Sequence, residues 1–405
     1  MLLDLENSKI KSAAQIAEFG IERESLRVTC EGTLAQTKHP FVGDPHIDRD
    51  FCENQVEIIG DVFTDPNDVC RQLGKFMDKI DEELKKNGEL LWAFSNPPIF
   101  GSEDEIPVAR FYGIHSGKSE YRNYLAQKYG KKKMLFSGIH LNISFTERLL
   151  LTAFSESGEN DYTGFKNNFY LRLSKRLTQY AWLVVFLTAA SPVCDPSLGI
   201  GSNVYSSIRC SEHGYWNDFT PILDYSSLQA YVRSIARYIV SGELKAASEL
   251  YYPVRLKPRG ANSLEALLDN GVNHLELRVL DVNPLTRTGV FAEDIRFIHL
   301  LLLWLSSLPD FDFDEAAQIK AIADVKAAAV FGSTDIRNRS EKTLGEIEKF
   351  TARYFPVFQD VVHYQINKLN KGSSYAEKVS RSFSDDYMKK GLALARSYQR
   401  GEENV

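Results

Sequence analysis

Four segments of the sequence alternate in the way a β-strand does, yet they carry charged or polar residues at their centres. They are residues 20–28, 50–59, 136–145 and 274–282. Successive side chains of a strand point to opposite faces, so such a segment presents one apolar face and one polar face. Because Asp and Glu are poor strand formers, their repeated use here needs a compensating reason. This feature predicts a sheet that is covered on one face and lines a cavity with the other.

The polar faces of these segments collect mostly carboxylates. Solvated carboxylates on half-exposed strands are the alternative interpretation of any single segment. Taken together, carboxylates in one cavity repel one another unless cations neutralise them, and oxygen ligands with one imidazole suit Mg²⁺ or Mn²⁺ better than zinc. The sequence therefore predicts a metal-dependent enzyme with an acidic active site. The polar positions are Glu22 and Glu24, then Asp50, Glu53 and Glu57, then His140 and Asn142, and finally Glu276 and Arg278.

The second segment poses a geometric condition. Asp50 and Glu57 differ in parity along the segment, so they would point to opposite faces of a regular strand. A bulge or a turn has to intervene before both carboxylates can reach one cavity.

Helical patterns fill the sequence between and after these segments. The clearest covers residues 66–86, where Asp65 supplies an N-cap, Pro66 takes the first helical position and Asn87-Gly88 ends the helix. Apolar residues at three-to-four spacing predict further helices over residues 165–190, 227–240, 292–307, 315–331 and 344–354, and almost only helix from about residue 313.

The domain organisation predicted from these patterns is simple. No repeat, low-complexity tract or linker divides the chain. The stretch that comes nearest to a linker is residues 155–164, which we expect to be a polar surface loop. We therefore expect one domain over residues 1–405, with the sheet in about 15–305 and a helical extension in about 313–405. Apolar residues of the last helices are expected to pack onto the body of the protein: Tyr375, Val379, Phe383, Tyr387, Leu392 and Leu394.

Charge, hydropathy and cysteine content exclude several classes of protein. A net charge of −6 gives no general attraction to nucleic acid or to an anionic membrane. The most apolar runs, residues 180–190 and 298–305, are shorter than the roughly 20 residues of a membrane span and are expected to be buried helices. The start of the sequence has no apolar stretch of signal-peptide length. Five scattered cysteines without CxxC spacing argue against disulfides or structural zinc and favour a reducing cytoplasm.

The common nucleotide and hydrolase motifs are missing from the sequence. It contains no GxxxxGK[ST], GxGxxG or GxSxG pattern. Residues 251–259 hold three cations in their last five positions: Arg255, Lys257 and Arg259. This segment is either a phosphate-binding neighbourhood or a solvated basic loop, and the pattern leaves both open.

An ordered series of blocks in the sequence resembles bacterial glutamate–cysteine ligase (γ-glutamylcysteine synthetase). The series spans about residues 15–305, and its order is far more specific than any single block. The blocks are GIERESLRV at 20–28, DFCENQVE at 50–57, Tyr121-Arg122 through Tyr129-Gly130, SGIHLN at 137–142, ASP at 190–192, ELY at 249–251 with Pro253 and Arg255, and LELR at 275–278 with LDVNP at 280–284.

The resemblance implies a glutamine-synthetase-like α+β fold, in which a curved antiparallel sheet forms a funnel backed by helices. It implies ATP-dependent coupling of L-glutamate to L-cysteine through γ-glutamyl phosphate, the first step of glutathione synthesis. Two or three Mg²⁺ ions are expected, with Mn²⁺ as an alternative, and Arg278 would touch the transferring phosphoryl group. Carried over by position, the metal ligands are Glu22, Glu24, Asp50, Glu57, His140 and Glu276. The substrate-binding residues, chiefly on the cysteine side, are Phe51, Leu125, Phe136, Arg209, Tyr215 and Tyr251.

The sequence departs from the family in its length and in its last quarter, which matches no block. Bifunctional relatives carry a glutathione-synthesising ATP-grasp domain after this region, and nothing here could be that domain. We expect either a compact ligase or the ligase part of a longer protein, acting in the cytoplasm as a monomer or small homo-oligomer. Two alternatives are a ligase of the same fold with another amine acceptor and a non-catalytic metal- or nucleotide-binding relative.

Overall fold

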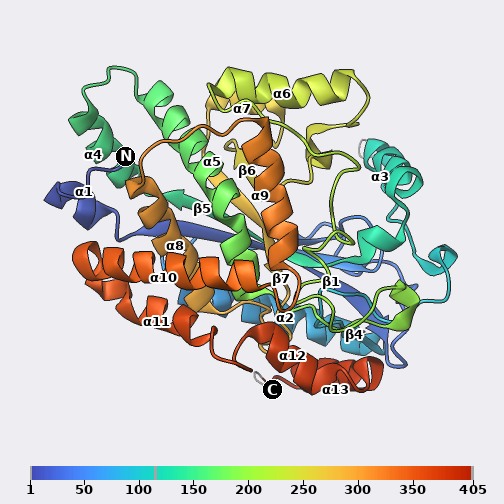
Figure 1. Ribbon diagram of the computed structural model, residues 1–405. Coiled ribbons are helices and arrows are strands. Elements are labelled where there is room, and N and C mark those ends of the chain that lie inside the picture. The colour runs from blue at the N-terminus through green and yellow to red at the C-terminus, as the bar shows by residue number, and fades with distance from the viewer. Residues whose placement is uncertain (1, 114–115, 403–405) are drawn as a thin grey trace.

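Seven strands form one antiparallel sheet at the centre of the computed structural model, which describes residues 2–113 and 116–402 (Figure 1). Six of them lie in the order β2-β3-β1-β5-β7-β6, and β4 pairs with the far end of β1. The strands are β1 Ala17–Thr29, β2 Ile47–Asp48, β3 Gln55–Ile59, β4 Glu89–Leu91, β5 Gly138–Phe145, β6 Val254–Lys257 and β7 His274–Asp281. The expected α+β class with an antiparallel sheet is confirmed.

The four segments predicted from their polar centres supply four neighbouring strands, β3, β1, β5 and β7. One of them is shorter than predicted. Regular strand structure begins only at Gln55, and Asp50 lies in the loop before it. A turn at residues 52–54 separates the two parts, so the intervening turn that the parity of Asp50 and Glu57 required is present.

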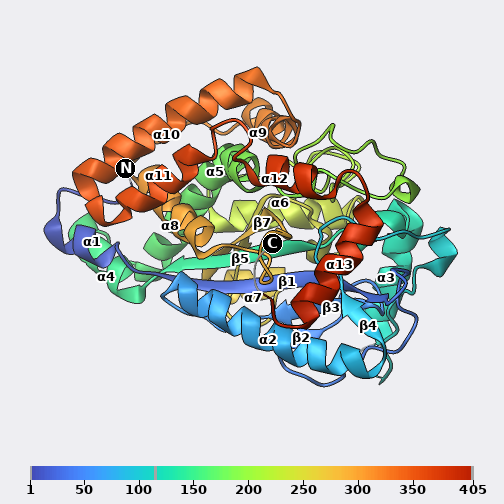
Figure 2. The ribbon, with the colours of Figure 1, turned by 90° about the horizontal axis from the view of Figure 1, so that it is seen from below.

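Helices cover the apolar face of the sheet. Ile21 of β1, Leu141 of β5 and Leu277 of β7 belong to one buried core with residues of α2, α5 and α8. Helices α9, α10 and α11 form a further layer outside α5 and α8 (Figure 2). The helices are α1 Ser8–Ala13, α2 Pro66–Lys86, α3 Ser116–Tyr129, α4 Glu147–Ser157, α5 Tyr162–Thr188, α6 Leu228–Val240, α7 Leu264–Asn270, α8 Ala292–Ser307, α9 Glu315–Ala328, α10 Thr334–Tyr354, α11 Gln359–Asn367, α12 Tyr375–Phe383 and α13 Tyr387–Gln399.

Most predicted helices are confirmed within a few residues, and α2 has the predicted Asp65 cap. Two predictions were wrong. Helix α10 begins ten residues earlier than predicted, because its first turns bury Ser340 and Thr343 in place of apolar residues and hide the periodicity. The predicted loop at 155–164 is mostly helix, and only residues 158–161 lie between α4 and α5.

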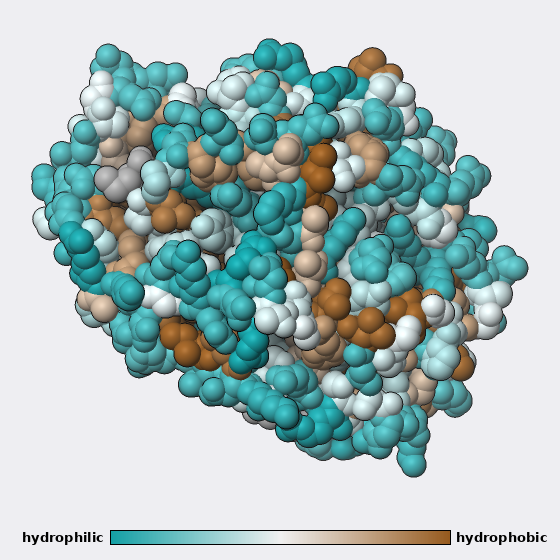
Figure 3. Space-filling model, viewed as in Figure 1, coloured by the Kyte–Doolittle hydropathy of each residue, from teal (hydrophilic) through white to brown (hydrophobic). Residues whose placement is uncertain are grey.

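The last two helices pack against the body of the protein as expected. Phe383 and Tyr387 pack edge-on against Phe94, with ring centroids 5.0 and 5.1 Å apart. Tyr375, Val379 and Leu394 are buried as well, and Leu392 is half-buried. The face seen in Figure 3 is mainly hydrophilic, with only scattered apolar patches. Across residues 2–113 and 116–402, none of the helices has the length and apolar character that a membrane crossing requires.

Candidate active site

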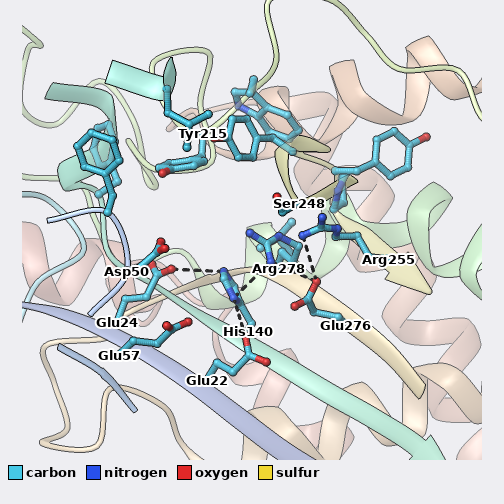
Figure 4. Close-up of a pocket in the computed structure, with 18 of the residues that line it drawn as sticks. Glu22, Glu24, Asp50, Glu57, His140, Tyr215, Ser248, Arg255, Glu276 and Arg278 are labelled. Atoms are coloured by element: carbon cyan, nitrogen blue, oxygen red, sulfur yellow. Dashed lines mark hydrogen bonds and ion pairs between the residues drawn. The ribbon is translucent and has the colours of Figure 1, made fainter. Parts of the chain in front are cut away.

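A pocket of about 300 Å³ opens on the polar face of the sheet (Figure 4). Its size is at the lower end of the range for small-molecule sites. All thirteen site residues expected from the sequence line it, although they come from strands, loops and one helix across most of the chain. They are Glu22, Glu24, Asp50, Phe51, Glu57, Leu125, Phe136, His140, Arg209, Tyr215, Tyr251, Glu276 and Arg278.

Strand register brings the acidic residues together. Glu24 of β1 lies directly opposite Glu57 of β3, and Glu22 of β1 lies opposite His140 of β5. Side chains at directly opposed positions share a sheet face and are close neighbours. Glu276 of β7 pairs with Asn142 of β5 and therefore points to the same face. The alternation seen in the sequence thus decides which side chains enter the pocket.

An irregularity between β5 and β7 shapes the pocket floor. Ile139 pairs with Leu280 and Leu141 pairs with Leu277, so His140 alone stands opposite two residues of β7, Arg278 and Val279. Such a bulge re-aims side chains and is frequent beside active sites. Both bulged residues line the pocket.

One side of the pocket is lined mainly by carboxylates, and few cationic side chains offset their charge. Burial raises the pKa of Glu57 well above its ordinary value, and the nearby carboxylates of Asp50, Glu22 and Glu24 raise it further. Burial also raises the pKa of Glu24, in spite of His140 nearby. Carboxylates so close together repel one another when charged, so this side of the pocket favours a bound cation.

Glu22 differs from Glu24 and Glu57 because its pKa is lowered and theirs are raised. Burial alone would raise its pKa, but the hydrogen bond with His140 and the charge of Lys257 bring it down to about 2. The Asn142 side-chain amide donates to Glu22 at 3.0 Å, and His140 Nδ1 lies 3.3 Å from the carboxylate.

The other side of the pocket carries its own cations. Glu276 lies 3.1 Å from Arg278, 3.2 Å from Lys257 and 3.7 Å from Arg255. Burial opposes its charge, but Arg278 and Arg255 outweigh burial and hold the pKa of Glu276 well below its ordinary value. These contacts exclude the solvated loop as an interpretation of residues 251–259, since Arg255 and Lys257 belong to β6 and line the pocket. Arg259 is exposed and lies outside it.

The residues at the junction of the two sides fit a divalent cation. Glu22, His140 and Glu276 offer ligand atoms that all lie within 4.8 Å of one another. Buried Oδ1 of Asn142 accepts no hydrogen bond within the described part of the chain, which leaves an oxygen donor available beside these residues. Carboxylate oxygens with a single imidazole are a donor set that Mg²⁺ or Mn²⁺ accepts.

An aromatic wall faces the acids. Tyr215 and Tyr251 meet edge-to-face with ring centroids 4.6 Å apart, and Phe51, Leu125 and Phe136 continue the wall. Figure 4 shows Tyr215 across the pocket from the acidic residues.

Arg209 braces the floor of the pocket. Its guanidinium donates to the backbone carbonyls of Arg278 and Leu280, which lie on either side of Val279 in the bulge. It crosses β5 at Gly138, where a Cβ atom would overlap the guanidinium. Two of its donors are therefore engaged by the protein itself.

Sequence reasoning missed the contribution of helix α3. Lys118, Tyr121 and Arg122 of this helix line the pocket, and so do Ser248 and Asn262. Helix α3 shows no apolar periodicity, so pattern analysis gave no helix here, although Tyr121-Arg122 stands in one of the blocks quoted above. Arg122 donates to the backbone oxygen of Asp50 and lies 3.6 Å from its carboxylate, which ties that acidic loop to α3.

Comparison with known proteins identifies the family of the chain. The model of the family described as glutamate-cysteine ligase matches residues 2–325. The glutathione biosynthesis bifunctional protein GshAB of Listeria monocytogenes is 37% identical over 318 residues, which cover 74% of this chain and 41% of that protein. The protein of the same name from Clostridium perfringens is 31% identical over 427 residues, covering 96% of this chain and 54% of that protein.

Solved structures share the fold. A bifunctional glutathione synthetase from Pasteurella multocida is 28% identical, with a TM-score of 0.88 over 98% of this chain and 54% of that one. A glutamate–cysteine ligase from Francisella tularensis, solved in complex with AMP, is 22% identical with a TM-score of 0.83, over 96% of this chain and 89% of that one. The chain spans about half the length of the curated relatives it matches.

Proposed function

We propose that this chain, which belongs to the glutamate–cysteine ligase family, joins the side-chain carboxylate of L-glutamate to the amino group of L-cysteine with ATP as co-substrate. The observation that carries the proposal is the division of one pocket into a mainly acidic side, a cationic side around Glu276 and an aromatic wall. These are the three surfaces that phosphoryl transfer to a carboxylate, followed by attack of an amine, requires.

The chemistry fixes the order of events. A carboxylate is a poor electrophile, and an amine does not displace oxide from it. Transfer of the terminal phosphoryl group of ATP to the γ-carboxylate breaks a phosphoanhydride bond, releases ADP and makes an acyl phosphate. The amine then attacks the acyl carbon, loses a proton and expels inorganic phosphate, forming γ-glutamylcysteine.

The cationic side of the pocket suits the phosphoryl group. The Arg278 guanidinium is oriented by Glu276 at 3.1 Å, and Arg255 and Lys257 lie beside the same carboxylate. We assign Arg278 to the transferring group, where a fixed guanidinium stabilises the charge that develops in the transition state.

The acidic side suits divalent cations. We assign Glu22, Glu24, Asp50, Glu57, His140 and Glu276 as the residues that would hold Mg²⁺, or Mn²⁺ in its place. When bound, the cations supply charge that offsets the repulsion between phosphate oxygens and the substrate carboxylate. We assign the wall, with Phe51, Leu125, Phe136, Arg209, Tyr215 and Tyr251, to the amino-acid substrates, chiefly cysteine.

The proposal also covers the cellular location, the partners and the oligomeric state of the protein. We place the protein in the cytoplasm, where ATP is available and where its five cysteines, all free in the structure, stay reduced. Its partners are these small molecules, and we expect a monomer or small homo-oligomer. We also propose that residues 1–405 act as one ligase domain.

Phosphate release tests the proposal directly. The full chain is incubated with ATP, Mg²⁺ and L-glutamate, and phosphate is measured with a panel of amines that includes cysteine, serine, 2-aminobutyrate and ammonia. Release that depends on cysteine, together with γ-glutamylcysteine detected by mass spectrometry, is the expected result. Preference for another amine would show a ligase with a different acceptor, and no release with any amine would show a non-catalytic relative.

A further inference from the structure

Behind the aromatic wall lies a carboxylate that none of the assignments above uses. Glu249, in the short 3₁₀ helix Ala247–Glu249, is fully buried and does not line the pocket. Its oxygens accept from Lys128 Nζ at 2.7 Å, from the Tyr129 hydroxyl at 2.8 Å and from the backbone N–H of Lys245 at 2.5 Å. A buried carboxylate with this many donors is an anchor, because each hydrogen bond to a charged group is stronger than a neutral one.

The donors to Glu249 come from the end of helix α3. Lys128 and Tyr129 are its last two residues, and the Tyr124 hydroxyl, one turn earlier, lies 3.4 Å from the same carboxylate oxygen. Burial works against the charge of Lys128, but the hydrogen bond to Glu249 outweighs it and raises the pKa of the lysine. The contact therefore joins α3 to a segment more than a hundred residues further along the chain.

A buried amide extends this anchor to the wall itself. Asn217 donates to the Tyr129 hydroxyl at 3.0 Å and to the backbone oxygen of Glu249 at 2.8 Å, and its own oxygen accepts from the backbone N–H of Tyr251 at 2.9 Å. Ser248 donates to the Tyr121 hydroxyl at 3.1 Å, on the pocket side of the same junction. The end of α3 and the residues leading to Tyr251 are thus held in one hydrogen-bonded unit.

Helix α3 is held only in part by apolar contacts: Leu125 lies in a hydrophobic cluster, and Tyr121, Tyr124, Ala126 and Tyr129 pack against that cluster half-buried. Only Arg122 and Leu125 of its fourteen residues are buried, and α3 stands apart from the helices that cover the sheet (Figure 1). Burial of apolar side chains normally fixes a helix in place. The placement of its pocket-facing residues, Lys118, Tyr121, Arg122 and Leu125, therefore depends on its polar contacts as well as on this packing.

We infer that Glu249 is a positioning residue that fixes helix α3 against the segment carrying Ser248 and Tyr251, and so sets the geometry of the wall on the acceptor side. The positioning of α3 stands on the contacts alone. Its consequence for the acceptor amine rests on the proposed function.

The test compares Glu249→Gln with Asp294→Asn. Asp294 in α8 offers a matched control, because it is also buried and accepts from a lysine, Lys368 at 2.6 Å, and a tyrosine, Tyr375 at 2.9 Å, but lies outside the pocket lining. Hydrogen–deuterium exchange of residues 116–129 is the readout that needs no activity. We expect Glu249→Gln to speed exchange there by at least about tenfold, the effect of losing one charge-assisted hydrogen bond, while Asp294→Asn leaves that segment unchanged.

Steady-state kinetics supply the second readout. With the full chain, Glu249→Gln is expected to raise KM for cysteine by about tenfold or more while KM for glutamate stays within about twofold, and Asp294→Asn is expected to change neither. Lys128→Met, which removes a donor from the partly exposed side of the contact, should reproduce both effects if Glu249→Gln does not fold.

The possible outcomes separate the inference from the proposed function. Unchanged exchange of residues 116–129 in Glu249→Gln and Lys128→Met would overturn the anchor. Faster exchange with equal effects on both KM values would keep the anchor and reject its link to the acceptor. If the unmodified chain turns over no amine, the proposed function fails, and the exchange data still decide whether Glu249 positions α3.

Discussion

The pocket and the helix-packed interior treat buried charge in opposite ways. In the interior, the guanidinium of Arg27 lies 2.6 Å from the carboxylate of Glu89, and both side chains are almost completely buried. In the pocket, Glu57 is half-buried, and the charges around it are the carboxylates of Asp50 and Glu22. The interior satisfies its charges with groups of the chain, whereas the acidic side of the pocket is left to be satisfied by something that binds.

This difference separates residues kept for stability from residues kept for function. Buried charges without partners destabilise a fold. Where a sequence keeps them, they indicate a functional site, because function there outweighs the loss of stability. Glu276 is the contrasting carboxylate within the same pocket, because three cations of the chain surround it. The protein thus surrounds Glu276 with its own cations, whereas Glu57 has only carboxylates among the charges that act on it most strongly.

The largest expected effect lies in the interior. Deleting residues 374–405 should unfold the protein, because it removes six buried side chains whose combined contribution, on the order of 10 kcal/mol, matches the whole stability of a typical domain. Circular dichroism and urea unfolding measure the loss. These side chains are Tyr375, Val379, Phe383, Tyr387, Leu394 and Tyr398. A shortened protein that stays folded would show that α12 and α13 are an addition to the domain.

A pair of glycines tests the same packing without deletion. Gly391 of α13 faces Trp92 so closely that a Cβ atom would overlap the indole ring, whereas Gly345 of α10 faces open space. Gly391→Ala should lower the free energy of unfolding by about 1–3 kcal/mol, and Gly345→Ala should raise it by up to about 1 kcal/mol. Equal effects of the two substitutions would contradict close packing of α13.

After the deletion, the largest expected effect is on activity. Glu57→Gln should lower kcat/KM at least about a thousandfold, or about 4 kcal/mol, because an amide is a poor ligand for Mg²⁺. In metal-free buffer the same substitution should hold or raise stability, since it removes one charge from a group of carboxylates. Enzyme assays and thermal unfolding with and without EDTA measure both changes.

Glu53→Gln is the matched control for Glu57. Glu53 stands in the same segment but accepts from the backbone N–H of His39 at 3.0 Å and pairs with Arg49 at 3.2 Å, outside the pocket lining. Its loss should spare activity and lower stability slightly. Near-normal activity of Glu57→Gln at ordinary magnesium would remove Glu57 from the proposed ligand set.

The sequence predicted the site residues on regular strands better than those in loops and bulges. Period-two alternation decides which face a side chain takes, so it identified Glu22, His140 and Glu276 as occupants of one cavity before any strand order was known. It could not place Asp50, which reaches the pocket from a loop, or anticipate the bulge that presents Arg278 beside Val279. Both depend on how distant strands pair.

Helix α3 shows the limit most clearly. Its last two residues donate hydrogen bonds to Glu249, more than a hundred residues away, and such contacts leave no local pattern in a sequence. Resemblance to a family could point to Tyr121 and Arg122 within a block, but not to the helix that presents them. Apolar periodicity does not reveal a helix that polar contacts hold in place to a large extent.

A smaller effect concerns a buried group of the interior. His299 Nε2–H donates a hydrogen bond at 3.0 Å to the backbone oxygen of Ala14, among the rings of Phe19 and Phe145, and burial lowers the pKa of His299 to about 4. Between pH 6.5 and 4 the unfolded chain binds a proton that the folded chain does not, so stability falls as the pH falls through this window. From pH 7 to pH 5 this group should cost about 2 kcal/mol.

Urea unfolding of His299→Gln measures this contribution. The variant should lose about 2 kcal/mol of the difference in stability between pH 7 and pH 5, whatever its stability at pH 7. His363→Gln is the control, because His363 is exposed on α11. An unchanged pH dependence in His299→Gln would mean that this histidine is already accommodated in its charged form.

The smallest effect returns to the pocket and tests what its aromatic wall selects. The Tyr251 ring is buried and meets Tyr215 edge-to-face at 4.6 Å, a surface suited to a polarisable thiol, since sulfur–ring contacts contribute about 0.3–1.5 kcal/mol. Serine would bury a hydroxyl there, at about 1–3 kcal/mol if it finds no partner. We expect cysteine to be preferred over serine by about tenfold in kcat/KM, with 2-aminobutyrate a usable surrogate. Tyr251→Phe keeps the ring and should keep the cysteine-to-serine ratio of kcat/KM, whereas Tyr251→Leu should bring that ratio toward one. A ratio that does not change when the ring is lost would place the acceptor side chain elsewhere in the pocket.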